Sequence, residues 1–169
     1  NMDANIKDYS QIKNNFDEIY TKISQNKFNA KVKILGAPKI YRHTNGSTAC
    51  LRRGVFGMPN KIFIREMPIH EMFYELSHEA GHNIKPHLED MSLHAEETKA
   101  CLFQNLFSQE IKNKNFEWLN DFIIFEKLRR DHISRINSKY EVYHNAAEYI
   151  IGETGNDLFE GIDYICSKL

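Results

Sequence analysis

The sequence predicts an α+β fold in a single domain. Short β-branched and aromatic runs lie within residues 29–65, and helical periodicity occupies most of the rest of the chain. The chain has 169 residues and a hydrophobic content of 41%, which suffices for one core and does not favour two. We therefore expect one domain over residues 1–169, made of an N-terminal helix (1–28), a core (29–112) and a C-terminal helical part (113–169).

An amphipathic helix is expected first, because apolar residues recur there at intervals of three and four. It carries Ile6, Tyr9, Ile12, Phe16, Ile19 and Ile23. The pattern then changes to alternation, which predicts a short strand at Val32 and Ile34. The Asn-Gly turn within residues 43–47 predicts a hairpin with Tyr41 in one arm and residues 48–51 in the other.

The compact run at residues 61–65 predicts a strand directly before the next helix. A strand at the edge of a sheet can pair with an extended peptide through main-chain hydrogen bonds. The sequence leaves open whether this strand or the preceding one is that edge.

The helix predicted over residues 68–83 has an apolar and a polar face. The apolar face consists of Ile69, Met72, Phe73, Leu76 and Ala80. The polar face consists of Glu71, Glu75, His78 and His82. The two histidines therefore point away from the expected core.

These residues contain an HExxH motif, His78-Glu79-Ala80-Gly81-His82. Two imidazoles one helical turn apart can bind a single Zn²⁺, and the Glu beside the first can accept a proton from a water molecule. This is the chemistry of a zinc peptidase. The alternative explanation is a solvated polar stripe on the helix.

A catalytic zinc ion needs a third protein ligand, and the next predicted helix, which begins near Ser92, offers carboxylates. His87 lies five residues after His82, which does not fit the extended HExxHxxGxxH motif, and His94 has no matching spacing. Glu96 and Glu97 remain as candidates.

Residues 62–107 resemble the ImmA/IrrE-type metallopeptidases, a gluzincin-like group, and are similar to the minigluzincins. The resemblance lies in YELSHEAGH at residues 74–82 and in ETKACLF at residues 97–103. It implies a zincin-like domain with a small twisted sheet, an HExxH helix, a Glu-bearing second helix and a C-terminal helical set. It further implies Zn²⁺ held by His78, His82 and Glu97, with Glu79 as the catalytic base. The second helix departs from the family pattern at Lys99, Cys101 and Gln104.

Helix geometry also favours Glu97 over Glu96, because neighbouring side chains on a helix point about 100° apart. Cys101 and Gln104 share the face of Glu97, whereas a ligand at position 96 would point into the apolar seam around Phe103. We expect Glu97→Gln to lose metal and activity, and Glu96→Gln, as a change in a solvated neighbour, to keep both.

The rest of the chain is expected to be helical, over residues 116–137, 141–151 and 157–169. The first of these should be one well-buried helix, or two helices broken near residues 130–131. A peptidase also needs a group that stabilises the oxyanion. The sequence leaves that role unassigned among four polar aromatic residues, Tyr140, Tyr143, His144 and Tyr149.

Composition restricts the partners and the compartment. A net charge of −1 gives no general attraction to nucleic acid or to anionic membranes, and no apolar run is long enough to span a bilayer. Three cysteines at spacings that suit neither disulfides nor a zinc site predict reduced thiols in a cytoplasmic protein. The abundance of Asn, Lys and Ile indicates a microbial source.

The predicted function is that of a zinc-dependent endopeptidase acting on a protein or peptide. The family resemblance implies a specific protein substrate, such as a phage-type or stress-response repressor, and a regulatory partner protein. The alternative is a non-catalytic regulatory or toxin-antitoxin binding module that zinc stabilises.

Overall fold

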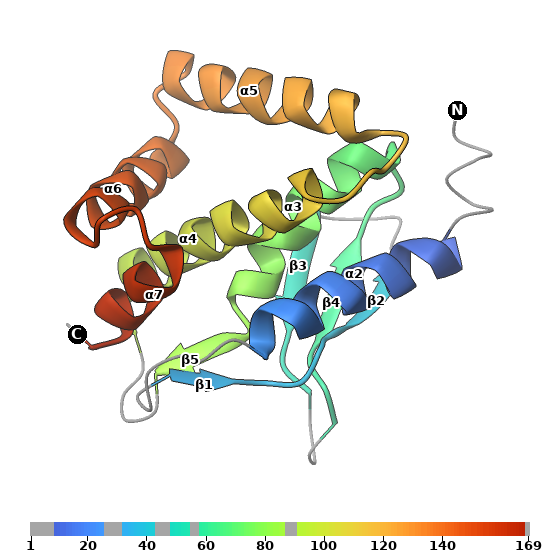
Figure 1. The fold of residues 1–169 in the computed structure, drawn as a ribbon, viewed down its shortest axis with the longest axis horizontal. Helices are drawn as coiled ribbons and strands as arrows, with labels where there is room; N and C mark the ends of the chain where they lie inside the picture. The colour runs from blue at the N-terminus through green and yellow to red at the C-terminus, as the bar shows by residue number, and fades with distance from the viewer. Residues whose placement is uncertain (1–8, 26–31, 43–47, 55–57, 87–90, 168–169) are drawn as a thin grey trace.

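A computed structural model of the chain describes residues 9–25, 32–42, 48–54, 58–86 and 91–167 (Figure 1). The structure is a mixed α+β fold, as predicted, and forms a single compact domain. The described part contains the helices α2 (Tyr9–Ser24), α3 (Ile69–Gly81), α4 (Leu93–Lys112), α5 (Leu119–Arg135), α6 (Lys139–Glu153) and α7 (Leu158–Ser167). Its strands are β1 (Val32–Ile34), β2 (Lys39–Arg42), β3 (Ala49–Arg52), β4 (Lys61–Ile64) and β5 (Ile84–Pro86).

The three-stranded sheet has the order β2-β4-β3, with β2 parallel and β3 antiparallel to β4. The predicted hairpin between Tyr41 and residues 48–51 is therefore wrong, because β4 lies between its two arms. The expected turn at residues 43–47 lies outside the described residues. Strand β4 is central because it buries both Ile62 and Ile64 completely and pairs its backbone on both sides. A local turn signal could not outweigh that burial.

The motif helix ends at Gly81, two residues before the end predicted at residue 83. The three residues Ile84–Pro86 form β5 instead, which pairs antiparallel with β1 as a second, two-stranded sheet. The buried side chain of Asn83 accounts for this early end. Its Nδ2 lies 2.8 Å from the Tyr20 hydroxyl and 2.8 Å from the Gly36 carbonyl oxygen, and its Oδ1 accepts from Asn60 at 2.6 Å. These distant partners hold the chain in a turn where the local pattern would have continued the helix.

Helix α4 runs through the middle of the molecule and packs against α2, α3, α6 and α7 (Figure 1). Ser92 caps its N-terminus by accepting a hydrogen bond from the Ala95 N–H at 3.2 Å, which satisfies one of the free donors of the first turn. The described residues of α4 that are fully buried or nearly so include Ala100, Cys101, Leu102, Phe103, Leu106, Phe107 and Ile111. Helix α4 is therefore the central helix of the fold, and one of its faces packs against α3.

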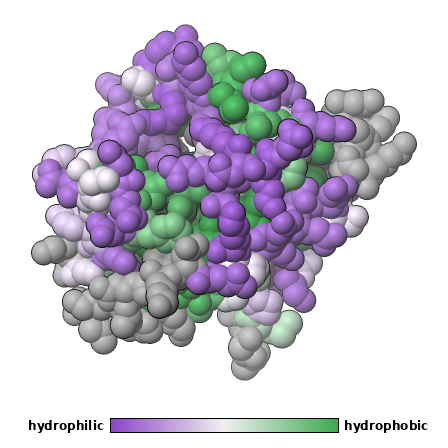
Figure 2. Space-filling model, in the orientation of Figure 1, coloured by the Kyte–Doolittle hydropathy of each residue, from purple (hydrophilic) through white to green (hydrophobic). Residues whose placement is uncertain are grey.

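Helix α5 is one continuous helix, with no break near residues 130–131, but it is not well buried. Its buried residues are Phe122 and Ile133, whereas Ile124 is 58% exposed and Leu128 is 60% exposed. The reason is visible in Figure 1, where α5 crosses the top of the molecule and packs mainly on α3 and α6. In the same view, Figure 2 shows apolar residues among hydrophilic ones at the top of the molecule. Apolar content alone overstated the burial of this helix.

No helix in the described part of the chain combines the length and the apolar character that crossing a membrane would require.

Candidate metal centre

The motif helix α3 presents its two faces as predicted. Met72, Phe73, Leu76 and Ala80 are buried in the core, while the side chains of His78, Glu79 and His82 are half-buried on the other face. The helix begins after Pro68, which cannot continue a helix towards the N-terminus, and His82 is its C-cap residue. The motif therefore lies in the last turn of α3, next to α4.

Gly81 allows the close approach of these two helices. A Cβ atom at this position would lie 2.7 Å from the Ala100 Cα and 3.0 Å from the Phe103 Cβ. Real Cβ atoms do not come so close to a backbone atom, so α3 and α4 would have to separate. Gly81 thus fixes the distance across which the motif histidines face the glutamates of α4.

Gly81→Ala is expected to lower the free energy of unfolding by about 1–3 kcal/mol, because the added methyl group overpacks the helix contact. Gly152→Ala is the matched control, since Gly152 is also helical but a Cβ added there would have nothing within 4 Å. That control should be neutral or stabilising, as alanine favours helix more than glycine does by about 1 kcal/mol. Chemical denaturation measures both. Equal stability of Gly81→Ala and the parent chain would refute the close approach.

His78, Glu79 and His82 form a cluster in which one ligand atom of each residue lies within 4.8 Å of the others. Side chains of this type, at this separation, can converge on a single metal ion. The HExxH spacing in the sequence predicted the cluster, because a helical turn brings the first and last residues of the motif together.

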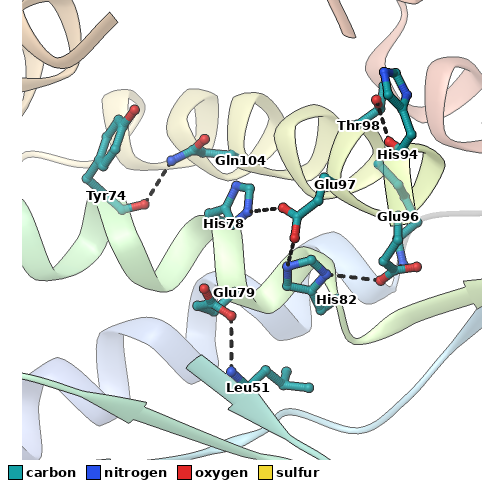
Figure 3. A network of polar contacts seen from close by, with 11 residues as sticks. Leu51, Tyr74, His78, Glu79, His82, His94, Glu96, Glu97, Thr98 and Gln104 are labelled. Carbon is teal, nitrogen blue, oxygen red and sulfur yellow. Dashed lines mark hydrogen bonds and ion pairs between the residues drawn. The ribbon is translucent and has the colours of Figure 1, made fainter. Parts of the chain in front are cut away.

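Glu97 reaches both histidines from α4. Its Oε2 lies 3.0 Å from the His78 Nε2, and its Oε1 lies 3.8 Å from the His82 Nε2 (Figure 3). Glu97 thus contacts the Nε2 atom of each histidine through a different oxygen, although the cluster of His78, Glu79 and His82 does not contain Glu97. Its role as the third ligand stays a prediction.

Glu96 lies on the opposite side of the His82 ring, where its Oε1 is 3.0 Å from Nδ1 (Figure 3). Its side chain is only 16% exposed, so the description of Glu96 as a solvated neighbour is wrong. No sequence pattern indicated this contact, because it depends on where α4 docks against the end of α3.

The charges of the site are coupled. Burial alone would lower the pKa of His78, but contacts with the Cys101 thiol and the Glu97 carboxylate raise that pKa to about 10. Burial alone would raise the pKa of Glu97, but its hydrogen bond to His78 and the charge of His82 hold the pKa below its ordinary value. His78 and Glu97 therefore form an ion pair. A metal ion bound at His78 Nε2 in place of the proton would also lie next to the Glu97 carboxylate.

Glu79 points to the sheet. Its Oε2 accepts a hydrogen bond of 3.0 Å from the backbone N–H of Leu51, in β3 (Figure 3). Burial raises the pKa of the Glu79 carboxyl, and the negative Glu97 acts in the same direction, whereas His82, His78 and the Leu51 N–H oppose the rise. A carboxylate with a raised pKa is better suited to accept and return a proton near neutral pH.

Strand β3 is an edge strand beside the motif helix. Among the described residues, β4 is central and is the strand that pairs with β3. The Leu51 N–H points away from β4 and towards Glu79. Nothing in the sequence indicated that Leu51 contacts Glu79, because the contact is made by its backbone N–H and not by its side chain.

A cleft of about 270 Å³ opens beside the cluster. Its lining comes from the edge strand and from four helices, and consists of Thr48, Ala49, Tyr74, Glu75, His78, Glu79, Gln104, Arg129, Ile133, Tyr140 and His144. Gln104 donates to the Tyr74 carbonyl oxygen at 3.0 Å, which fixes one wall. Helices α5 and α6 therefore form one wall of the cleft. The sequence of these two helices contains no motif that predicted this position.

The structure separates the four polar aromatic residues of the C-terminal part. Tyr140 and His144 line the cleft, and the Tyr140 ring centroid is 6.2 Å from that of His78. Tyr143 instead packs against His94 at 5.2 Å between ring centroids, and Tyr149 is 66% exposed.

Of the remaining histidine candidates, His94 does not join the cluster. His94 lies at the start of α4 against Tyr143, and its backbone carbonyl accepts from the Thr98 hydroxyl. His87 lies outside the described residues.

Comparison of the chain with protein-family models, with curated proteins and with solved structures found no match.

Proposed function

We propose that this protein is a zinc-dependent endopeptidase with His78, His82 and Glu97 as metal ligands and Glu79 as the catalytic base. One observation carries the proposal: two imidazole Nε2 atoms and a carboxylate from the next helix face each other beside a second carboxylate, at the edge of a sheet. The resemblance of residues 62–107 to ImmA/IrrE-type metallopeptidases supports it.

The donor set suits zinc. Two neutral imidazoles and one carboxylate are a known ligand set of catalytic zinc sites, which leave a further position open. When bound, zinc would make a water molecule more acidic and polarise the carbonyl group of the peptide bond. The convergence of Glu97 on both Nε2 atoms supports these three residues as the ligands.

Glu79 is the group that moves the proton. It accepts a proton from the attacking water and returns it to the leaving amine, so it must be close to the reacting atoms and must not be consumed as a ligand. Its hydrogen bond to the Leu51 N–H orients the carboxylate. The raised pKa makes the carboxylate a stronger base, which favours uptake of the proton.

The edge strand gives the substrate its expected orientation. An extended peptide can add to β3 through main-chain hydrogen bonds that do not depend on side-chain identity, beside the Leu51 N–H, which already donates to Glu79. The cleft wall formed by Tyr74, Ile133 and His144 would contact the side chains of that peptide. Cleavage in an extended, exposed segment of a protein follows from this arrangement.

The purified protein is expected to carry about one zinc ion per chain after zinc loading, because the site offers one convergent set of ligands. Elemental analysis after removal of free metal measures this, with Glu97→Gln as the variant that should lose the ion. A chain that retains no zinc would overturn the proposal. A zinc ion with four protein ligands and no exchangeable water would favour a non-catalytic, zinc-stabilised binding module instead.

Cleavage is expected to be selective. The cleft is small and partly covered, and the family resemblance points to one protein partner, such as a phage-type or stress-response repressor, cut at an exposed loop or linker. Incubation with candidate repressors, with and without a chelator, tests this by mass spectrometry of the products. Rapid, unselective digestion of casein would contradict it.

A further inference from the structure

We propose that Glu96 and Lys99 form a positioning array that orients His82 towards the metal. The array runs from the ammonium group of Lys99 to the Glu96 carboxylate and on to the Nδ1 atom of the His82 ring. The inference rests on the proposed function for its purpose, but the array itself consists of contacts among residues that the proposal does not use as ligand or base, apart from His82.

The contacts are short and share one oxygen atom. The Lys99 Nζ lies 2.8 Å from the Glu96 Oε1, and the same oxygen lies 3.0 Å from the His82 Nδ1. Lys99 also donates to the backbone carbonyl oxygen of Ile84. Since Ile84 follows His82 by two residues, Lys99 is bound to the chain segment that carries His82 as well as to Glu96.

The burial of Lys99 indicates that these contacts matter. Its side chain is 0% exposed, whereas lysine is almost never fully buried unless it is paired. Placing an ammonium group in a protein interior carries a large desolvation penalty, which pairing and hydrogen bonding must offset. An apolar residue at this position of α4 would avoid that penalty. The chain instead keeps a charge that contacts Glu96, the partner of His82 Nδ1, and the backbone of Ile84, two residues after His82.

His82 is the histidine that needs an external support. It is the C-cap residue of α3, beyond the last helical residue, so the helix restrains it less than it restrains His78. A hydrogen bond from Nδ1–H to a carboxylate fixes the ring plane and places the lone pair on Nε2, the atom that faces Glu97. Lys99 in turn prevents Glu96 from rotating into solvent or towards the metal.

The array can be tested with near-isosteric variants. Glu96→Gln and Lys99→Met each remove one charge, and the double variant removes both. The control is Lys112→Met with Glu126→Gln, because that pair also joins a lysine of α4 to a glutamate, at 2.7 Å, but lies away from the cluster and is more exposed, at 42% for Lys112 and 23% for Glu126. Two measurements are made: zinc affinity by competition with a chromophoric chelator, and the His82 tautomer of the metal-free protein by ¹⁵N NMR at alkaline pH.

Each single variant is expected to lower zinc affinity by about 10- to 100-fold, the usual effect of removing a partner of a metal ligand. The parent chain should show the Nδ1–H tautomer of His82, and both single variants should lose its preference. The double variant should recover the stability of the metal-free fold, because no unpaired charge stays buried, without recovering zinc affinity. The control pair should change neither measurement.

Two outcomes would overturn the proposal: a parent chain with the Nε2–H tautomer, or a double variant that binds zinc as tightly as the parent. The second outcome would mean that Glu96 only neutralises Lys99. A parent chain that binds no zinc but shows a tautomer that depends on Glu96 would refute the proposed function and still support the orientation of His82.

Discussion

Replacing Glu79 with glutamine is expected to leave zinc bound and to lower the rate of peptide hydrolysis by about 10²- to 10⁴-fold, the usual contribution of a general base. Glutamine has nearly the same shape as glutamate but cannot accept the proton of the attacking water. Because Glu79 faces the Leu51 N–H and is assigned no ligand role, the metal affinity should stay close to that of the parent chain.

The measurement pairs zinc titration with cleavage kinetics on the substrate that the parent chain cuts. Glu71→Gln is the matched control, since it removes a carboxylate from the same helix but outside the lining of the cleft. The Glu71→Gln control should keep both the zinc affinity and the cleavage rate of the parent chain. Loss of zinc in Glu79→Gln would show that Glu79 is a ligand and that another group accepts the proton.

Glu97→Gln is expected to lose zinc affinity by at least about 100-fold and to lose activity with it. The substitution removes one of three ligands, which is a larger change than the loss of a residue that only orients a ligand. Within the described part of α4, the Glu97 carboxylate is the group that contacts the Nε2 atoms of both histidines.

Glu96→Gln provides the comparison. The sequence analysis expected no effect from this change, but the contact of Glu96 with His82 Nδ1 now predicts an intermediate loss. A paired zinc titration of the two variants shows which of them binds zinc more weakly. Weaker zinc binding in Glu96→Gln than in Glu97→Gln would exchange the two roles and break the register with the resembled family.

The helix faces of the site followed from the sequence. Spacing by three and four placed Met72, Phe73, Leu76 and Ala80 in the core, and the same 100° rotation per residue placed His78 and His82 together on the other face. The helix start near Ser92 and the strand at residues 61–64 were equally local signals. These features depend on residues near one another in the chain, so a periodic pattern is enough to predict them.

Tertiary structure alone decided which strand became the edge. The Asn-Gly turn favoured pairing between the strands that flank it, yet β4 inserts between them because its Ile62 and Ile64 fill the core against α3. That insertion leaves β3 at the edge beside Glu79. Pairing between distant strands depends on burial summed over the whole sheet, which no short window of sequence contains.

The sequence by itself determined the chemistry available at the centre: two histidines, a neighbouring glutamate and a pair of glutamates on the next helix. Only the tertiary structure decided what each glutamate faces. The docking angle of α4 on α3, with Gly81 against Ala100, turns Glu97 to the Nε2 atoms and Glu96 to Nδ1. It also buries Lys99, because the position that looks polar in the sequence lies where α4 meets the segment after the motif helix. A rotation of either helix by a fraction of a turn would exchange these partners, and that rotation is fixed by packing across the whole interface.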